Sequence, residues 1–453
     1  MSTARTERQR REPSDRAGGE GRDGMAPQAP ATATLCCDEN EKLNLSRRGL
    51  LGRGLAVGAG AALTGLAGEA LSTSLAFAAG AYTGDTLVVI SLRGGFDGLS
   101  AFAPIGDAEY YKARPGIAVP KAKVIAGDGM FGLHPALAPL LPQWKAGRLA
   151  AVHAVGQPNP TRSHFAAMEA MENAAPGTSI RTGWLDRMLG LTGAAGPLAA
   201  VSMGGSMPAR LFAGPSADVS MKGVDDFTLA AEGRKPMAAA LRAMYADAPP
   251  LMAGAARAAD RALAATTSVR SAAGAPANGA SYPATDTGAA LRDVARLIKA
   301  KKGLVTATVD CGDWDMHEGL GPAVKGQRMY DNLAGLASAV AAFVTDLGET
   351  AMKKVTVLTI SEFGRRVEEN GSRGVDHGHG NAMMLLGGGI RGGKVYGTWP
   401  GLAPAALVSG DLRAVTDYRA VIGEVLRKRC GVGALDKVFP GVEPSSFGLA
   451  VAA

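Results

Sequence analysis

From Gly84 onward, the hydrophobic positions of this chain alternate between short apolar runs and longer amphipathic stretches. The short runs are rich in β-branched residues and stay apolar over successive positions, which is typical of strands buried on both faces. We expect strands at Thr86–Leu92, Arg148–Val155, Leu198–Met203, Gly303–Asp310, Lys353–Ser361 and Ala382–Leu386.

The segments between these runs have helical periodicity. We expect helices at about Phe165–Asn173, Pro236–Tyr245, Leu251–Thr267, Gly288–Ala300, Gly326–Leu347 and Thr416–Arg429. Helices between apolar strands indicate βαβ crossovers and a mostly parallel sheet sandwiched by helices. Residues 271–287 are small and polar, and we interpret them as a loop between two helices. The pattern therefore predicts a single α/β domain over residues 84–453.

The first part of the chain has a different composition. Residues 1–45 are polar and mixed in charge, with little apolar material to bury, so we expect them to be disordered. Arg47 and Arg48 then precede a mildly apolar, Gly/Ala-rich stretch, which ends at the small-x-small sequence Ala76-Phe77-Ala78. Residues 46–79 resemble a twin-arginine (Tat) signal peptide.

A membrane anchor is the alternative interpretation of this stretch. Arg53, Glu69 and many glycines interrupt it, whereas a spanning helix needs about 20 firmly apolar residues. We therefore predict no stable membrane span, recognition by the Tat export machinery, cleavage near Ala78, and a periplasmic or secreted mature protein.

Composition excludes two classes of protein. Of the 453 residues, 47% are hydrophobic and 20% charged, which is unlike a disordered chain or a small disulfide-stapled scaffold. The net charge of +7 is spread along the chain without a Lys/Arg block, so we expect no nucleic-acid partner. Cys311 and Cys430 follow the leader, and the sequence does not decide whether they pair.

Polar side chains follow the predicted strands, and ligands of open parallel sheets bind outside the carboxyl ends of the strands. Four of the six histidines lie in these segments. The candidates are Asp97 after the first strand, Arg162, Ser163 and His164 after the second, Asp313, Asp315 and His317 after the fourth, and Glu362, Arg365, Asp376, His377 and His379 after the fifth. The other two histidines, His134 and His153, we expect to be structural.

Two of these segments have the ligand types of a metal site. Asp313-x-Asp315-x-His317 and Asp376-His377-x-His379 combine carboxylates with imidazoles, a set that suits Zn, Mn, Mg or Ca. Nearby glycines allow the backbone to fold tightly enough for such residues to converge. The alternative is that these residues only cap helices and close turns. Because the two segments follow successive strands, we predict a divalent-metal site.

Ser163 precedes a predicted helix, where the positive end of the helix dipole favours an anionic substrate. The hydroxyl is either a metal-activated nucleophile or an ordinary N-cap. Arg93, Arg162 and Arg365 are candidates to clamp a phosphate or sulfate, the alternative for each being a surface or salt-bridged arginine. The chain has neither a GK[ST] P-loop nor a GxSxG motif.

Taken together, LRGGFDGL, FGLHPAL, RSHFAAMEAME, DWDMH, SEFGR and DHGHGNAMMLLGGGIRGGKVYG resemble the bacterial family catalogued as domain of unknown function 1501. The resemblance runs from about Thr86 to Arg429. It implies an alkaline-phosphatase-like fold, in a superfamily that includes phosphatases, sulfatases and phosphomutases. Members of that superfamily usually hold one or two divalent metals at the carboxyl edge of a parallel sheet.

The resemblance also implies roles for individual residues. Asp97 resembles the ligand after the first strand, Ser163 has the nucleophile's position, and Asp315 and His317 resemble the Asp–His pair of one metal site. Glu362 follows the strand where the superfamily commonly has Asp-His, Phe363 stands in place of that histidine, and His377 or His379 would supply the late histidine. Asp376-His377 is an alternative Asp-His pair, reached by a longer loop.

Two functions follow as expectations. The first is an exported metal-dependent hydrolase of small anionic phosphate or sulfate esters, in which Ser163, His164, Arg162 and Arg365 are the catalytic candidates. The second is a metal-stabilised, non-catalytic binding or assembly protein with the same fold, because function resides in the site and not in the fold.

Overall fold

The structure is a computed structural model that describes residues 82–453, with the exception of residues 195, 206–208, 230–234, 273 and 444. The predicted disordered segment, 1–45, and the predicted signal peptide, 46–79, lie outside the described residues. All described residues fall within one compact unit, Leu66–Ala453.

A central sheet runs through this unit in the strand order β10-β4-β9-β8-β1-β7-β5-β6, with β11 also paired to β4. A small second sheet pairs β2 with β3. The bounds are β1 Thr86–Leu92, β2 Phe102–Ala103, β3 Gly132–Leu133, β4 Leu149–Gly156, β5 Ala200–Met203, β6 Val219–Met221, β7 Thr306–Cys311, β8 Val355–Ile360, β9 Asn381–Gly387, β10 Val395–Tyr396 and β11 Thr416–Asp417.

The central sheet is mostly parallel, as predicted, with one reversed strand. β1 pairs in parallel with β7 and β8, and β5 pairs in parallel with β6 and β7. β9 is antiparallel to both β4 and β8. Because β9 is reversed, its amino end lies at the same edge as the carboxyl ends of β4 and β8. The loop that precedes β9 therefore joins the loops that follow the parallel strands.

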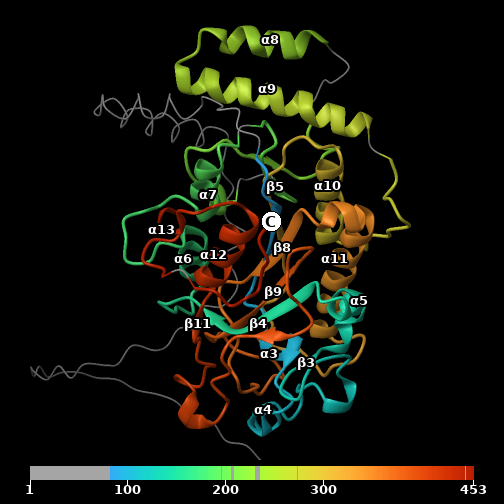
Figure 1. Ribbon diagram of the computed structural model, residues 1–453, viewed down its shortest axis with the longest axis vertical. Coiled ribbons are helices and arrows are strands. Elements are labelled where there is room, and N and C mark those ends of the chain that lie inside the picture. Colours follow the sequence, from blue (N-terminus) through green and yellow to red (C-terminus); the bar gives the residue numbers. More distant parts are fainter. Residues whose placement is uncertain (1–81, 195, 206–208, 230–234, 273, 444) are drawn as a thin grey trace, which may run out of the picture. The chain divides into compact units, whose positions relative to one another are not determined.

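Helices cover both faces of the sheet (Figure 1). The α-helices are α3 Gly98–Ala101, α4 Ala108–Ala113, α5 Leu141–Lys145, α6 His164–Asn173, α7 Trp184–Thr192, α8 Lys235–Ala246, α9 Pro250–Ser271, α10 Asp286–Lys299, α11 Arg328–Met352, α12 Tyr418–Arg429 and α13 Leu435–Val438. Short 3₁₀ turns are η2 Lys121–Lys123, η3 Pro135–Leu140, η4 Arg210–Phe212 and η5 Pro404–Ala406. All six predicted helices are present. α9 ends at Ser271 and α10 begins at Asp286, so the loop expected between these two helices falls where it was predicted.

The strand β1 shows how the two layers are built. Val88, Ile90 and Leu92 belong to the core cluster shared with α10 and α11, whereas Leu87 and Val89 belong to the cluster shared with α7 and α12. Successive side chains of a strand point to opposite faces, so a continuously apolar strand fills both cores. The apolar runs of the sequence are explained by this two-sided burial.

Among the described helices, α11 is long and apolar enough to cross a membrane by length and composition. Half of that window is buried within the protein, and α11 contacts α10, η3 and β8. These contacts make α11 a core helix of the layer that it shares with α10.

The sequence pattern missed several short elements. The strands β6, β10 and β11 have only two or three residues, too few to show a periodicity. The helix α7 has nine residues and buries Trp184, Leu185 and Met188 against the second core.

Candidate functional site

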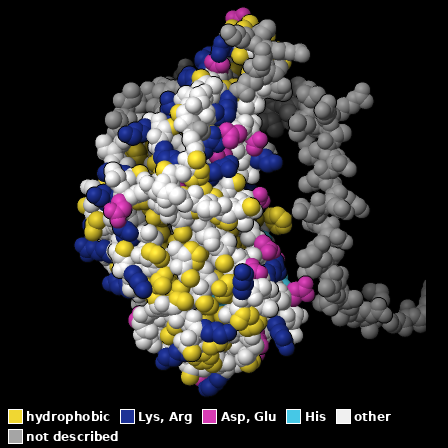
Figure 2. All heavy atoms as spheres, turned by 90° about the vertical axis from the view of Figure 1, so that its right-hand side faces the viewer, with side chains coloured by type: hydrophobic (Ala, Val, Ile, Leu, Met, Phe, Trp, Pro, Cys, Tyr) yellow, Lys and Arg dark blue, Asp and Glu magenta, His cyan; other side chains and the backbone are white. Residues whose placement is uncertain are grey.

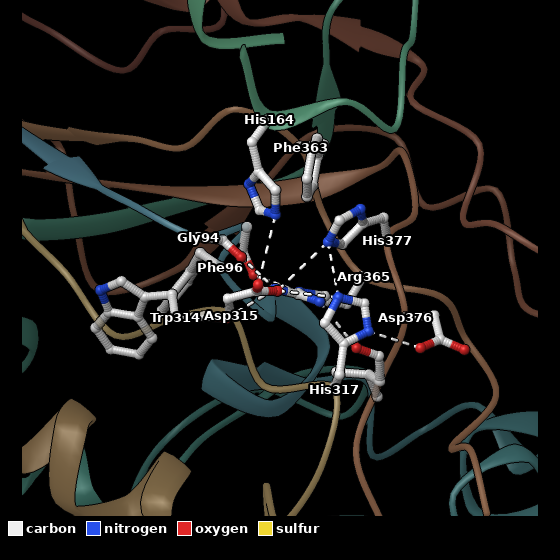
Figure 3. Close-up of polar contacts among 12 residues, drawn as sticks. Gly94, Phe96, His164, Trp314, Asp315, His317, Phe363, Arg365, Asp376 and His377 are labelled. Atoms are coloured by element: carbon white, nitrogen blue, oxygen red, sulfur yellow. Dashed lines mark hydrogen bonds and ion pairs between the residues drawn. The ribbon is translucent and has the colours of Figure 1, made fainter. Parts of the chain in front are cut away.

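The carboxyl edge of the sheet brings together segments that are far apart in the sequence. His164 is the first residue of α6, which follows β4, and Asp315 and His317 lie in the loop after β7. Glu362 follows β8, and His377 lies in the loop that leads into β9. The predicted convergence of acidic and imidazole side chains at this edge is therefore present for these five residues, and Figure 3 shows all of them but Glu362 with labels.

Three histidines surround one carboxylate, and we call His164, Asp315, His317 and His377 the histidine cluster. Asp315 Oδ1 lies 3.1 Å from His317 Nε2 and 3.3 Å from His377 Nε2, and Asp315 Oδ2 lies 3.6 Å from His164 Nε2. The Nε2 atoms of His317 and His377 are 2.9 Å apart. His164, Asp315 and His377 offer ligand atoms that all lie within 4.8 Å of one another.

The other ring nitrogen of each histidine has its own partner outside the cluster. His164 Nδ1 lies 3.1 Å from Glu362 Oε1, and His317 Nδ1 lies 2.8 Å from Asp376 Oδ1. His377 Nδ1 lies 2.8 Å from the backbone oxygen of Arg162. All three partners are hydrogen-bond acceptors, so Nδ1 is the donor in the tautomer that fits each contact, and the Nε2 atom of each ring faces Asp315.

By the spacing of their ligand atoms, His164, Asp315 and His377 could hold a metal ion. Ligands on a tetrahedron with zinc bonds of about 2.0–2.1 Å lie about 3.3 Å apart, and the cluster's contacts span 2.9 to 3.6 Å. The Nε2 atoms of His317 and His377 lie 2.9 Å apart, a separation that needs a proton or a cation between them. Histidines that ligate metals also donate their second ring nitrogen to a carboxylate or a carbonyl, as all three do here.

The electrostatics of the cluster also favour positive charge. Hydrogen bonds to Asp315 and Glu362 raise the pKa of His164 to about 9. Burial raises the pKa of Asp315, but His164, His377 and Arg365 outweigh this effect and hold the pKa well below its usual range. Glu362 is buried, which raises its pKa, yet hydrogen bonds from His164 and from the backbone N–H of Gly94 lower it overall.

Comparison with protein families gives one match. The family model described as a protein of unknown function (DUF1501) matches residues 85–417, which include every strand from β1 to β11 and the whole histidine cluster. The chain belongs to the DUF1501 family. Comparison with curated proteins finds none that matches this DUF1501 chain.

In this DUF1501 protein Arg365 organises the site from within and is unlike the predicted anion clamp. Its side chain is fully buried, and one Nη2 hydrogen bond of 2.6 Å goes to Asp315 Oδ1. Its other N–H groups donate to backbone oxygens of four residues from three loops, Gly94, Gly95, Trp314 and Val375. The guanidinium of Arg365 therefore positions Asp315. Solvent does not reach this guanidinium, because the Arg365 side chain is buried.

Asp97 and Asp313 are held by other partners. Both oxygens of Asp97 accept hydrogen bonds from the buried Arg114, at 2.6 and 2.9 Å, although the resemblance implied a metal ligand. Arg114 also donates to the backbone of Arg366, so this ion pair fixes the loop that carries Arg365. Asp313 is exposed and binds Arg328 and Asn332. Neither carboxylate is therefore available to the cluster in this geometry.

Three further candidates border the cluster. Ser163 is exposed and is the N-cap residue of α6, but its side chain makes no cap hydrogen bond. Arg162 pairs with Asp411 at 2.7 Å. His379 directs Nε2 to the backbone oxygen of Gln157, at 2.8 Å, and lines a cavity of about 20 Å³ behind Glu362 that has room for about one water molecule.

Sequence reasoning missed the residues that support the cluster. Phe363 packs its ring against both His164 and His377, with centroids 4.9 and 4.6 Å apart. Asn370 donates to Asp376 and to the backbone oxygen of His317. Phe363 was noted in the sequence only as a residue in place of a histidine, and Asn370 has no local signal because its role depends on the path of the loop.

The remaining histidines and cysteines lie away from this chemistry. His134 caps η3 by accepting from the backbone N–H of Ala136, and His153 is buried in β4 against Phe131 and Trp399. Burial lowers the pKa of each of these two histidines to about 4. Cys311 and Cys430 are buried, and both are unpaired in the described part of the chain.

Proposed function

We propose that this protein is an exported, divalent-metal-dependent hydrolase of small phosphate or sulfate esters. The observation that carries the proposal is the convergence of three imidazole Nε2 atoms on Asp315, with each opposite Nδ1 held by an acceptor. An alkaline-phosphatase-like fold and a Tat leader are parts of the same proposal. They are supported by the site at the carboxyl edge of a mostly parallel sheet and by the paired arginines Arg47 and Arg48.

His164, Asp315, His317 and His377 would hold the metal, which could be Zn, Mn, Mg or Ca. A bound divalent cation would stabilise negative charge on the ester and activate a nucleophile at neutral pH. Glu362 and Asp376 would keep the imidazoles of His164 and His317 oriented toward the cation, and Arg365 holds Asp315 in place.

Ser163 is the proposed nucleophile. It is next to His164, and its hydroxyl makes no cap hydrogen bond to α6, which distinguishes it from an ordinary N-cap serine. The first turn of α6 lies at the cluster because His164 contacts Asp315. Backbone N–H groups at such a helix start favour an anionic group, so α6 would orient the ester oxygens.

The cluster is accessible to a substrate. The side chains of His164, Asp315 and His317 are 28%, 42% and 45% exposed, so an ester can approach from solvent. This exposure distinguishes the site from the buried Asp97–Arg114 pair, which solvent does not reach.

The burial and ion pairing of two arginines favour a second function. Arg365 is buried and Arg162 is paired with Asp411, so neither of these two candidates is free to clamp an anion. The same centre would then serve a metal-stabilised binding or assembly protein that performs no hydrolysis.

One experiment separates the two functions. The metal content of the purified protein is measured together with turnover of an aryl phosphate and an aryl sulfate, for the wild type, Ser163→Ala and the control Ser445→Ala. A hydrolase loses metal-dependent turnover in Ser163→Ala alone while keeping its metal. Metal-replete wild type that turns over neither ester, with Ser163→Ala unchanged in every property, contradicts the hydrolase and supports the binding protein.

A further inference from the structure

The helices α8 and α9 form a hairpin that differs from the rest of the described chain. In Figure 1 this hairpin lies beyond the sheet, with α8 on the far side of α9. The second half of α9 packs on the core through Ala262 and Val269, which are buried. In contrast, no described side chain of α8 is buried. α8 therefore rests mainly on α9.

The hairpin exposes apolar side chains that the core does not cover. The side chains of Met237, Met244 and Met252 are 42%, 68% and 52% exposed. A helix as short as α8 is marginal in water and depends on the packing of an apolar face. The apolar residues of α8 are thus left without the cover that helices in the body of the protein have.

A groove of about 400 Å³ lies between the two helices. Its lining is mostly apolar and includes Ala238, Leu241, Tyr245, Ala253, Ala256 and Leu263. Several alanines line the α9 side of the groove, and the exposed methionines lie on the same two helices. A two-fold contact between identical subunits pairs the same surface on both copies, so side chains of one hairpin would enter the recess of the other.

We propose that the α8–α9 hairpin is a dimerisation surface that receives the same hairpin of a second copy of this chain. The 22 residues of α9 make a helix about 33 Å long, and the 12 residues of α8 make one about 18 Å long beside it. With a width of about 10 Å for each helix, such a face would bury roughly 500 Å² per copy, or about 1,000 Å² in total, the size at which specific protein interfaces begin.

The charged side chains along the groove are of both signs, which a contact between two copies can pair. Arg242 pairs with Asp260 at 2.9 Å, and Arg257 lines the same groove, so both signs meet at its rim. Charged side chains of both signs also accompany the hydrophobic ones at the top of Figure 2, where the hairpin lies. The hairpin carries Lys235 and the arginines 242, 257, 261 and 270 against Asp247 and Asp260, so two identical copies can pair opposite charges, and an anionic lipid surface is the competing occupant that the test below separates.

Sedimentation equilibrium of the full-length protein under reducing conditions, from submicromolar to high micromolar concentration, tests this proposal. We expect the wild type to reach twice the monomer mass. The variants Met244→Glu and Met252→Glu place a carboxylate in the apolar contact and should weaken dimerisation about 100-fold. Leu191→Glu, at a helical position that is 38% exposed on α7, is the matched control and should dimerise as the wild type does.

Circular dichroism and the unfolding midpoint of each variant establish that the monomer is still folded. A wild type that stays monomeric at every concentration overturns the proposal, as does a dimer that both Met→Glu variants leave unchanged. Flotation with phosphatidylglycerol vesicles is measured in parallel. A monomeric wild type whose vesicle binding falls in the Met→Glu variants, but not in Leu191→Glu, identifies lipid as the occupant and likewise overturns it.

Discussion

The histidine cluster and the α8–α9 hairpin differ in how their side chains are satisfied. Each histidine of the cluster has partners on both ring nitrogens, and Arg365 ties Asp315 to three loops. The methionines of the hairpin face solvent, and α8 buries none of its described side chains. The polar groups of the first region are satisfied within one copy of the chain, whereas the described apolar side chains of α8 stay partly or fully exposed in it.

This difference predicts which substitutions act within the monomer. A change at the carboxyl edge breaks several interactions together, because one side chain serves several loops. A change on the hairpin removes little from the monomer and acts on association. The following experiments test this contrast, beginning with the largest expected effect.

Replacing Arg365 should have the largest effect on stability. Arg365→Met leaves four backbone oxygens and Asp315 without their buried donor, and we expect a loss of about 3–5 kcal/mol in the free energy of unfolding, measured by urea denaturation. Arg181→Met, at an exposed arginine, should change it by less than about 0.5 kcal/mol. Equal effects of the two variants would show that Arg365 does not organise the site.

Removing a cluster ligand should weaken metal binding with less effect on the fold. We expect Asp315→Asn to lower the affinity for Zn²⁺ by about 100-fold or more, measured by competition with a chelator. Asp313→Asn, two residues away and paired with Arg328, is the control and should stay within about threefold of the wild type. Metal binding that depends on both aspartates equally would contradict the four-residue cluster.

Substitutions of the two supporting carboxylates, Glu362 and Asp376, should weaken metal binding less than substitution of a ligand. Glu362→Gln and Asp376→Asn keep the size of the side chain but remove the charge that holds an Nδ1 proton. We expect each to reduce Zn²⁺ affinity by about 10-fold to 100-fold in the same assay. An affinity unchanged in both variants would mean that the Nδ1 contacts do not orient the imidazoles.

The two buried histidines predict how stability depends on pH. Burial lowers the pKa of His134 and His153 to about 4 in the folded chain, whereas a histidine in the unfolded chain has a pKa of about 6.5. Between pH 4 and pH 6.5 the unfolded chain therefore binds more protons than the folded chain. Stability should therefore fall as the pH decreases from 7 to 5, by about 2 kcal/mol for each histidine. Urea denaturation at both pH values should show a smaller fall in His153→Gln; an identical fall would exclude His153 as a cause.

The smallest change in the free energy of unfolding is expected for a substitution on the α8–α9 hairpin. In dilute solution, where the protein is monomeric, Met244→Glu should change the free energy of unfolding by less than about 0.5 kcal/mol, because the side chain is 68% exposed. Ala262→Glu, at the fully buried side of α9, should cost several times more. If Met244→Glu destabilised the monomer as much, the methionine would be packed within its own chain.

The sequence alone determined the elements of this fold and the loops that carry its chemistry. Buried strands such as Thr86–Leu92 and helices such as α10 follow from the local order of apolar and polar residues, which burial on one or two faces imposes. The strand ends were predictable for the same reason, and with them the loops that contain His164, Asp315, His317 and His377.

Only the tertiary structure decided which side chains in those loops meet. It reversed β9, paired Asp97 with Arg114, buried Arg365 and turned His379 toward Gln157 instead of toward the cluster. Each outcome depends on the path of a loop and on a partner that is distant in the sequence, for example 268 residues away for the contact of Gly94 with Glu362. A local pattern of residues contains no information about such partners, because their distances are set by the packing of the whole sheet.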